Sequence, residues 1–122
     1  MRILLIESDK EYTKKFKSWI QSLNFQVVSV HTLDQTVEEI NNNPFDLALI
    51  NPVSPYFTPD ELINRLRPLP GRPDIIILSS LNSRKLELQM RDFGILFYLV
   101  TPIDIYMFKN ILSHLSSKYK KT

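Results

Sequence analysis

The sequence contains no cysteine, and only two of its residues are glycine. The absence of cysteine excludes disulfides, thiol catalysis and zinc–thiolate sites, and it is consistent with a reducing cytoplasm. The two glycines are too few for the loops that cradle nucleotide phosphates, and neither the G-x-G-x-x-G fingerprint nor a P-loop motif occurs. Dinucleotide-binding and P-loop enzymes are therefore excluded.

The sequence also lacks a large excess of positive or negative residues. The chain has 15 lysines and arginines against 13 acidic residues, and a net charge of +2 is too small to indicate direct binding of nucleic acid. No apolar run approaches the roughly 20 residues of a membrane span. The first run, residues 3–6, is too short for a signal peptide. These observations predict a cytoplasmic, soluble protein that does not bind a membrane.

What the sequence does contain is an alternation of short apolar runs and helical patterns. The expected strands are residues 3–6, 25–30, 46–51, 74–79 and 95–100. The expected helices are residues 10–23, a segment opening at 31–32 and stopping in 41–44, a segment opening at 58–61 and ending before Pro68, then residues 83–92 and 104–118. This alternation predicts a parallel sheet with helices on both faces. With 122 residues, the chain fits one domain, residues 1–122.

Apolar residues at helical spacing predict which faces are buried. On the last helix, Ile105, Phe108, Leu112 and Leu115 share one face that we expect to point inward. The proline-rich loop at residues 52–59 is expected to expose Tyr56 and Phe57, either to dock a partner or to cover the ligand site.

In a doubly wound sheet, ligands bind at the carboxyl ends of the strands. The residues expected there are Glu7, Ser8 and Asp9, then Asn51 and Pro52, then Ser79 and Ser80, and finally Thr101 and Pro102.

These residues resemble the receiver domains of bacterial response regulators, over essentially the whole chain. The resemblance is carried by Ile3–Asp9, by the third strand, residues 45–51, by the fourth, residues 76–80, and by the spacing of Gly94, Tyr98 and Pro102. It implies a doubly wound, flavodoxin-like (βα)5 fold in the α/β class, with strand order 2-1-3-4-5 and a cis Thr101–Pro102 bond.

The resemblance also implies positions for the family's phosphorylation chemistry, and this sequence departs from most of them. The acidic pair that helps to hold Mg²⁺ corresponds to Glu7 and Ser8, so one carboxylate is missing. The phospho-acceptor position is Asn51, whose amide is a poor nucleophile. The switch Ser/Thr position is Ser79, which is retained, whereas the lysine position is Thr101.

These departures predict a degenerate pseudo-receiver that has no cofactor and no functional metal site, although Asp9 is a displaced candidate ligand for Mg²⁺. Two interpretations of Asn51 stand: its amide binds an unknown ligand, or it hydrogen-bonds to neighbouring strand ends. Ser79 is interpreted as a relic that caps a strand end. His31 and His114 are isolated from other metal ligands and are expected at the surface.

A partner surface is expected where the fourth helix, fifth strand and fifth helix meet. The resemblance places the switch aromatic at Tyr98 there, and Leu88, Met107 and Ile111 lie off the core-facing stripes. Such a surface binds other signalling proteins or forms a homodimer. The ordinary alternatives are a half-buried strand tyrosine and a wide buried stripe.

The sequence thus predicts a non-enzymatic, phosphorylation-independent signalling module of the two-component type that acts by protein–protein interaction. Two alternatives stand beside it: a phosphorylatable regulator with another acceptor, such as Ser8 or Asp9, and a small-molecule sensor that uses the vacated pocket.

Overall fold

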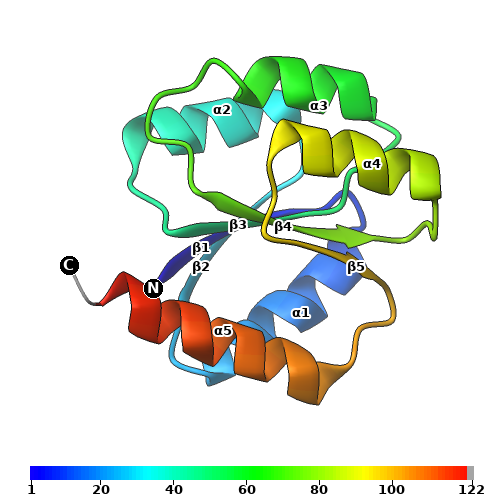
Figure 1. Ribbon diagram of the computed structural model, residues 1–122. Coiled ribbons are helices and arrows are strands. Elements are labelled where there is room, and N and C mark those ends of the chain that lie inside the picture. The colour runs from blue at the N-terminus through cyan, green and yellow to red at the C-terminus, as the bar shows by residue number, and fades with distance from the viewer. Residues whose placement is uncertain (121–122) are drawn as a thin grey trace.

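A five-stranded parallel sheet forms the centre of the computed structural model, which describes residues 1–120 (Figure 1). The strands are β1 (Arg2–Ile6), β2 (Gln26–Val30), β3 (Leu47–Ile50), β4 (Asp74–Ser79) and β5 (Phe97–Val100). They are ordered β2-β1-β3-β4-β5, and every neighbouring pair is parallel. The predicted fold class and strand order are confirmed.

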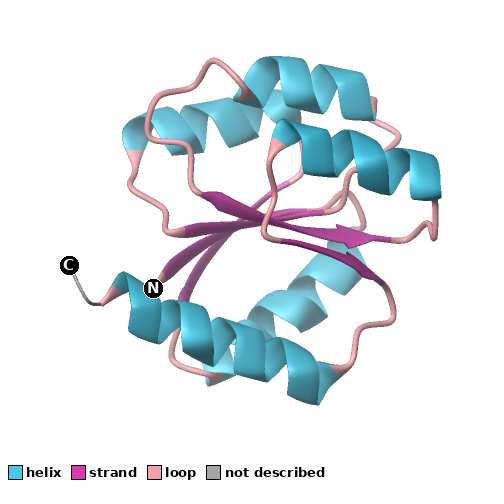
Figure 2. Cartoon of the chain, in the orientation of Figure 1, coloured by secondary structure: helices cyan, strands magenta, loops and turns pink. Residues whose placement is uncertain are grey.

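Within residues 1–120, five helices cover the sheet, and Figure 2 shows them in two layers. They are α1 (Lys10–Ser22), α2 (Leu33–Asn42), α3 (Pro59–Leu66), α4 (Arg84–Phe93) and α5 (Ile105–Tyr119). α1 and α5 lie on one face of the sheet, and α2, α3 and α4 lie on the other (Figure 1). Each strand therefore sits between two helical layers.

Local sequence signals fix where the helices begin and end. Thr58 and Glu61 form a capping box at the start of α3: the Thr58 hydroxyl accepts from the Glu61 N–H, and the Glu61 carboxylate accepts from the Thr58 N–H. Gly94 follows α4 with a φ of 112°, a conformation that glycine adopts without a steric cost. The capping box thus marks the start of α3, and Gly94 marks the end of α4.

The alternating residues of each strand feed two separate hydrophobic cores. Ile3 and Leu5 of β1 face α1 and α5, whereas Leu4 and Ile6 face the other helical layer. All four side chains are buried. This double burial is why β1 reads as a continuous apolar run instead of an alternating pattern.

The prediction that Ile105 belongs to the inward face of α5 is wrong. Phe108, Leu112 and Leu115 are buried, but Ile105 is 44% exposed. It is the first residue of α5, and the helix begins beyond the end of the edge strand β5, where the sheet no longer covers it. Helical spacing identifies a face, but it does not say how far the neighbouring layer extends.

Within residues 1–120, no helix combines the length and the apolar character required to cross a membrane.

Candidate functional site

The polar residues that follow the strands come together at the carboxyl edge of the sheet. The Asn51 N–H donates to the Ile6 carbonyl at 3.0 Å, which places Glu7 and Asn51 side by side. The Thr101 N–H donates to the Ser79 carbonyl at 2.9 Å and joins the next two strand ends. Parallel strands in register thus assemble the residues that are separated in the sequence.

Glu7 and Asn51 form a closed hydrogen-bonded pair. Glu7 is only 6% exposed. The Asn51 Nδ2 donates to Glu7 Oε1 at 3.0 Å, and the Asp9 N–H donates to Glu7 Oε2 at 3.1 Å. The Val53 N–H donates to Asn51 Oδ1 at 3.0 Å. Buried polar groups are stable only when they are paired, so the amide at position 51 supplies a partner that a buried carboxylate requires.

The prediction that Asn51 hydrogen-bonds to neighbouring strand ends is therefore confirmed. The residue after it is Pro52, which is buried and has no N–H. The donor to the Asn51 oxygen is consequently the N–H of Val53, one residue further along.

Asp9 and Ser8 do not complete an acidic cluster. Asp9 is exposed and caps α1, with its Oδ1 accepting from the Tyr12 N–H at 3.0 Å. In the described part of the chain, no group of three or more histidine or acidic side chains is arranged to hold a metal ion. The Mg²⁺ that the family's chemistry uses does not fit these residues, because Glu7 is the one buried carboxylate within residues 1–120 and protein donors contact both of its oxygens.

Ser79 belongs to a second, neutral network. Its hydroxyl donates to the Leu81 carbonyl at 3.0 Å and accepts from the Leu81 N–H at 3.0 Å. The Tyr98 hydroxyl donates to the same Leu81 carbonyl at 3.0 Å, and the Thr101 hydroxyl lies 3.4 Å from the Ser79 carbonyl. Ser79 thus ties the end of β4 to the following loop, as its interpretation as a strand-end cap predicts. The Thr101–Pro102 peptide bond is cis.

His31 is not the surface residue that the sequence led us to expect. It is half-buried, and its Nδ1 lies 2.7 Å from the backbone oxygen of Glu7. The signal that would have placed it is topological: His31 follows Val30, and Val30 pairs with Ile6 across β1 and β2. His114, in contrast, is exposed.

The pKa of Tyr12 is shifted, in part by Glu7 at this edge. Burial, and secondarily the negative charge of Glu7, raise the pKa of Tyr12 above its usual value. The phenol is therefore neutral at physiological pH.

The loop after β3 differs from the prediction at one residue. Tyr56 is exposed, as expected, but Phe57 is buried and packs into the core beneath α2, α3 and α4. Phe57 directly precedes Thr58, the N-cap of α3, and its side chain belongs to the same core as Leu62 of that helix. Phe57 therefore stabilises the loop and is not available to a partner.

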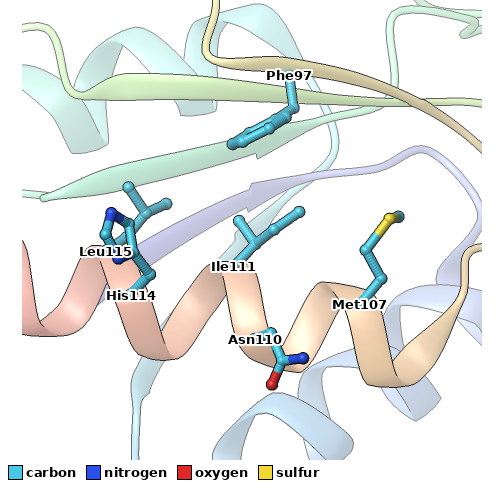
Figure 3. A pocket seen from close by; sticks show the side chains of 6 residues that line it. All are labelled: Phe97, Met107, Asn110, Ile111, His114 and Leu115. Atoms are coloured by element: carbon cyan, nitrogen blue, oxygen red, sulfur yellow. The ribbon is translucent and has the colours of Figure 1, made fainter.

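An apolar surface lies on the outer side of β5. Leu88 of α4, Phe97 of β5 and Met107 of α5 are 52%, 40% and 42% exposed. A groove of about 410 Å³ lies between β5 and α5, and Figure 3 shows Phe97 above Met107, Ile111 and His114. We call this surface the α4–β5–α5 face.

Sequence reasoning placed Tyr98, Leu88, Met107 and Ile111 on this face but missed Phe97. Tyr98 is half-buried and packs toward the α4 side of the sheet, whereas Phe97 lines the groove on the α5 side. The available signal was the strand order, since the last strand of a 2-1-3-4-5 sheet is an edge and leaves apolar side chains uncovered.

The fold is that of CheY-like receiver domains. The chain superimposes on a CheY-like response regulator receiver domain from Methanospirillum hungatei with a TM-score of 0.84 and 20% identity, covering 99% of this chain and 98% of that one. A response regulator receiver domain from Francisella gives a TM-score of 0.83 and 22% identity, covering 97% and 98%.

A response regulator from Burkholderia pseudomallei, solved with a phosphorylated aspartic acid, a calcium ion and citrate, gives a TM-score of 0.80 and 18% identity, covering 93% of this chain and 65% of that one. No family model matches the sequence, and no curated protein matches it. At these identities the likeness shows the fold, and function has to be argued from the site.

Proposed function

We propose that this chain is a pseudo-receiver, a non-enzymatic cytoplasmic module of two-component signalling that acts by protein–protein contact and independently of phosphorylation. The proteins that share its fold are receiver domains of response regulators, which supports the signalling class. The departure from phosphorylation rests on this chain's own residues.

The observation that carries the proposal is the hydrogen bond from Asn51 Nδ2 to Glu7 Oε1. A phospho-acceptor needs a carboxylate oxygen to attack phosphorus, and a carboxamide has neither the charge nor the nucleophilicity. In this site the amide faces the remaining carboxylate and stabilises it. The position that resembles the acceptor thus serves as an internal hydrogen-bond donor.

The surroundings of Asn51 support the same conclusion. Phosphoryl transfer depends on positioned cations that neutralise developing charge. Position 101 is threonine, and its hydroxyl is directed to the Ser79 carbonyl. The alternative acceptor Asp9 is exposed and occupied as the cap of α1.

The test is a ¹H–¹⁵N spectrum before and after the addition of Mg²⁺ and beryllofluoride, which mimics a phosphoryl group on a carboxylate. We expect no shifts at Glu7, Asn51, Ser79 and Tyr98. The triple variant Ser8→Asp/Asn51→Asp/Thr101→Lys, which restores the three departed positions, is the positive control and is expected to shift. A concerted shift of those four residues in the unmodified chain would refute phosphorylation independence.

We propose further that partner binding uses the α4–β5–α5 face. Leu88, Phe97 and Met107 are exposed apolar residues, and Phe97 and Met107 line one groove between β5 and α5. Tyr98 connects this face to the carboxyl edge of the sheet, because its hydroxyl donates to the Leu81 carbonyl in the loop after β4. The face is suited to another signalling protein or to a second copy of the chain.

Sedimentation and pull-down with candidate two-component proteins test this face. Met107→Glu is expected to abolish self-association or partner binding, because it places a charge in the apolar groove. Tyr56→Glu is the matched control, since Tyr56 is comparably exposed but lies on the loop after β3. Equal losses from the two variants would show that binding does not use this face.

A further inference from the structure

The charges of the helices are divided unequally between the two faces of the sheet. α1 carries four lysines and a single acidic residue, Glu11. α2 carries one aspartate and two glutamates and no lysine or arginine. Figure 1 shows α1 and α5 on one face of the sheet, so the lysines of α1 give the α1 margin of that face a positive charge. The small net charge of the whole chain conceals this division.

An apolar groove of about 380 Å³ lies along that margin. Its wall on α1 is formed by Tyr12, Phe16 and Trp19, and its opposite wall includes Ile103 and Ile105. Lys15 lines the same groove. We call this feature the α1–α5 groove. Its volume falls within the range of about 300–1,000 Å³ found for ligand sites.

The groove is built on a rigid base. Phe16 packs against Phe108 with ring centroids 5.7 Å apart, and Trp19 packs against Phe108 at 6.1 Å. Phe108 is fully buried. The aromatic rings therefore hold α1 and α5 at a fixed separation, and the groove requires no rearrangement to receive a side chain.

The residues at the start of α5 leave apolar surface beside this groove. Ile105 is 44% exposed and the adjacent Tyr106 is 83% exposed. Neither contributes to the core, and Ile105 lines the same groove as Lys15. An apolar patch of this kind, bordered by charge of one sign, is typical of a surface that a partner covers.

Lys15 is free to bind an external anion. Its nearest acidic neighbour is Glu11, at 3.7 Å in an i,i+4 pair whose side chains are 79% and 83% exposed. Exposed pairs of this type are weak and readily exchanged. The lysine ammonium can therefore turn from Glu11 to a partner carboxylate.

We propose that the α1–α5 groove binds an acidic amphipathic segment of another protein. A bulky apolar side chain of that segment fills the groove between Trp19 and Ile105. Its carboxylates bind Lys15 and the other lysines of α1, which steer the approach and set the orientation.

A second copy of this chain is a poorer occupant. Its acidic helix is α2, and the described part of the chain has no large exposed apolar side chain on α2 that could enter the groove. An anionic lipid surface fits less well too, because a flat layer of headgroups does not fill a concave apolar groove. Charge and shape together favour an acidic protein segment.

This proposal is independent of the α4–β5–α5 face. The α1–α5 groove lies toward α1, whereas the other face lies toward α4 and the edge strand. Variants on one surface leave the other intact, so the two proposals can fail separately.

Trp19 is the only tryptophan of the chain and lines the groove, so its fluorescence reports occupancy directly. The probe is a helical peptide with glutamates on one face and leucine and phenylalanine on the other. We expect a blue shift of Trp19 emission on titration, and binding that weakens as salt rises from about 0.05 M to about 0.5 M, because salt screens exposed charges. The same peptide with lysines in place of glutamates is expected not to bind.

Two pairs of variants distinguish binding at the α1–α5 groove from diffuse charge attraction between the peptide and the protein. Lys15→Glu is expected to weaken peptide binding about tenfold. Lys85→Glu makes the same charge change on α4, in the opposite helical layer, and is expected to leave binding unchanged. Ile105→Glu is expected to abolish the Trp19 shift, whereas Leu88→Glu, at a similarly exposed leucine of α4, is expected to retain it.

Three outcomes overturn the proposal. One is the absence of any Trp19 shift with the acidic peptide up to about 1 mM. Another is an equal loss from Lys15→Glu and Lys85→Glu, which would indicate diffuse charge attraction. The third is a Trp19 shift with vesicles of mixed phosphatidylserine and phosphatidylcholine but not with the peptide, which would assign the surface to a membrane.

Discussion

The carboxyl edge of the sheet and the start of α5 satisfy their side chains by different means. At the edge, Glu7, Asn51 and Ser79 hydrogen-bond to groups of the same chain. At the start of α5, Ile105 and Tyr106 are apolar or aromatic and largely exposed. A site of the first kind needs nothing from outside, whereas a surface of the second kind loses unfavourable hydration when a partner covers it.

This difference favours the start of α5 over the carboxyl edge as the place for a partner to bind. Receiver folds place their chemistry at the carboxyl edge, as doubly wound sheets do in general. Here the polar residues at that edge bind one another, whereas Ile105, Tyr106 and Met107 at the start of α5 are exposed.

If the exposed residues of α5 serve binding and not stability, alanine substitutions at a buried and at an exposed position of α5 should differ sharply in their effect on the unfolding free energy. Phe108→Ala removes a fully buried ring that contacts Phe16 and Trp19, and we expect a loss of about 4 kcal/mol in unfolding free energy. Ile105→Ala is expected to cost less than about 1 kcal/mol. Urea denaturation measures both, and a similar cost for the two would place Ile105 in the core.

Asn51→Asp should break the hydrogen-bonded pair that residue 51 forms with Glu7. The new carboxylate would face Glu7 at hydrogen-bond distance, and two carboxylates so close do not both ionise without cost. We expect a loss of about 3 kcal/mol at neutral pH, from the lost amide donor and the like charges together.

The pH dependence of this variant has a definite sign. Repulsion by Glu7 raises the pKa of the introduced aspartate in the folded state above its unfolded value near 3.9. The folded protein therefore binds the proton more tightly than the unfolded chain does. Stability of Asn51→Asp relative to the parent should therefore fall as the pH rises from about 4 to 7. Asn64→Asp, at an exposed residue of α3, is the control, and a pH-independent difference at position 51 would contradict the closed-pair account.

Tyr98→Phe tests the link between the edge and the α4–β5–α5 face. The variant loses one hydrogen bond to the Leu81 carbonyl and keeps the ring, so we expect a loss of about 1 kcal/mol and a chemical-shift change at Leu81. Tyr106→Phe removes the same atom from an exposed ring and should be neutral. Identical spectra around Leu81 in Tyr98→Phe and the parent would show that the bond is not formed in solution.

The smallest effect is expected at the far end of α5. Burial, together with the hydrogen bond to Asp74 at 2.6 Å, raises the pKa of Tyr119 above its usual value. A raised folded pKa means that this contribution to stability is complete below about pH 10 and is lost as the pH rises further. Parent and Tyr119→Phe should thus converge in stability above that pH, as urea denaturation at about pH 8 and pH 10.5 can measure. The control, Tyr56→Phe, should show no convergence.

Much of the fold could be predicted from the sequence because its signals are local. β1 and β4 are apolar runs buried on both faces, and Thr58 with Glu61 marks a helix start. The edge of the sheet could be predicted as well, through the resemblance at Asn51, Ser79 and Thr101. These positions follow strands directly, so their location needs only the order of the elements.

The errors concern how far each layer extends. Ile105 has the helical spacing of a core residue but lies beyond the sheet, and Phe57 sits in a polar, proline-rich loop but reaches the core. His31 was misplaced because its contact with Glu7 joins two residues that directly follow the neighbouring strands β1 and β2. Periodicity describes a residue relative to its own element, and these three depend on the extent of another element.

The proline after Asn51 has a consequence for the chemical ageing of the protein. Spontaneous deamidation of asparagine usually begins when the backbone nitrogen of the next residue attacks the side-chain amide and closes a succinimide ring. Pro52 has no N–H, so its nitrogen cannot make this attack. The amide at position 51 is thereby protected from this slow conversion to a carboxylate, and old molecules do not acquire an acceptor that new ones lack.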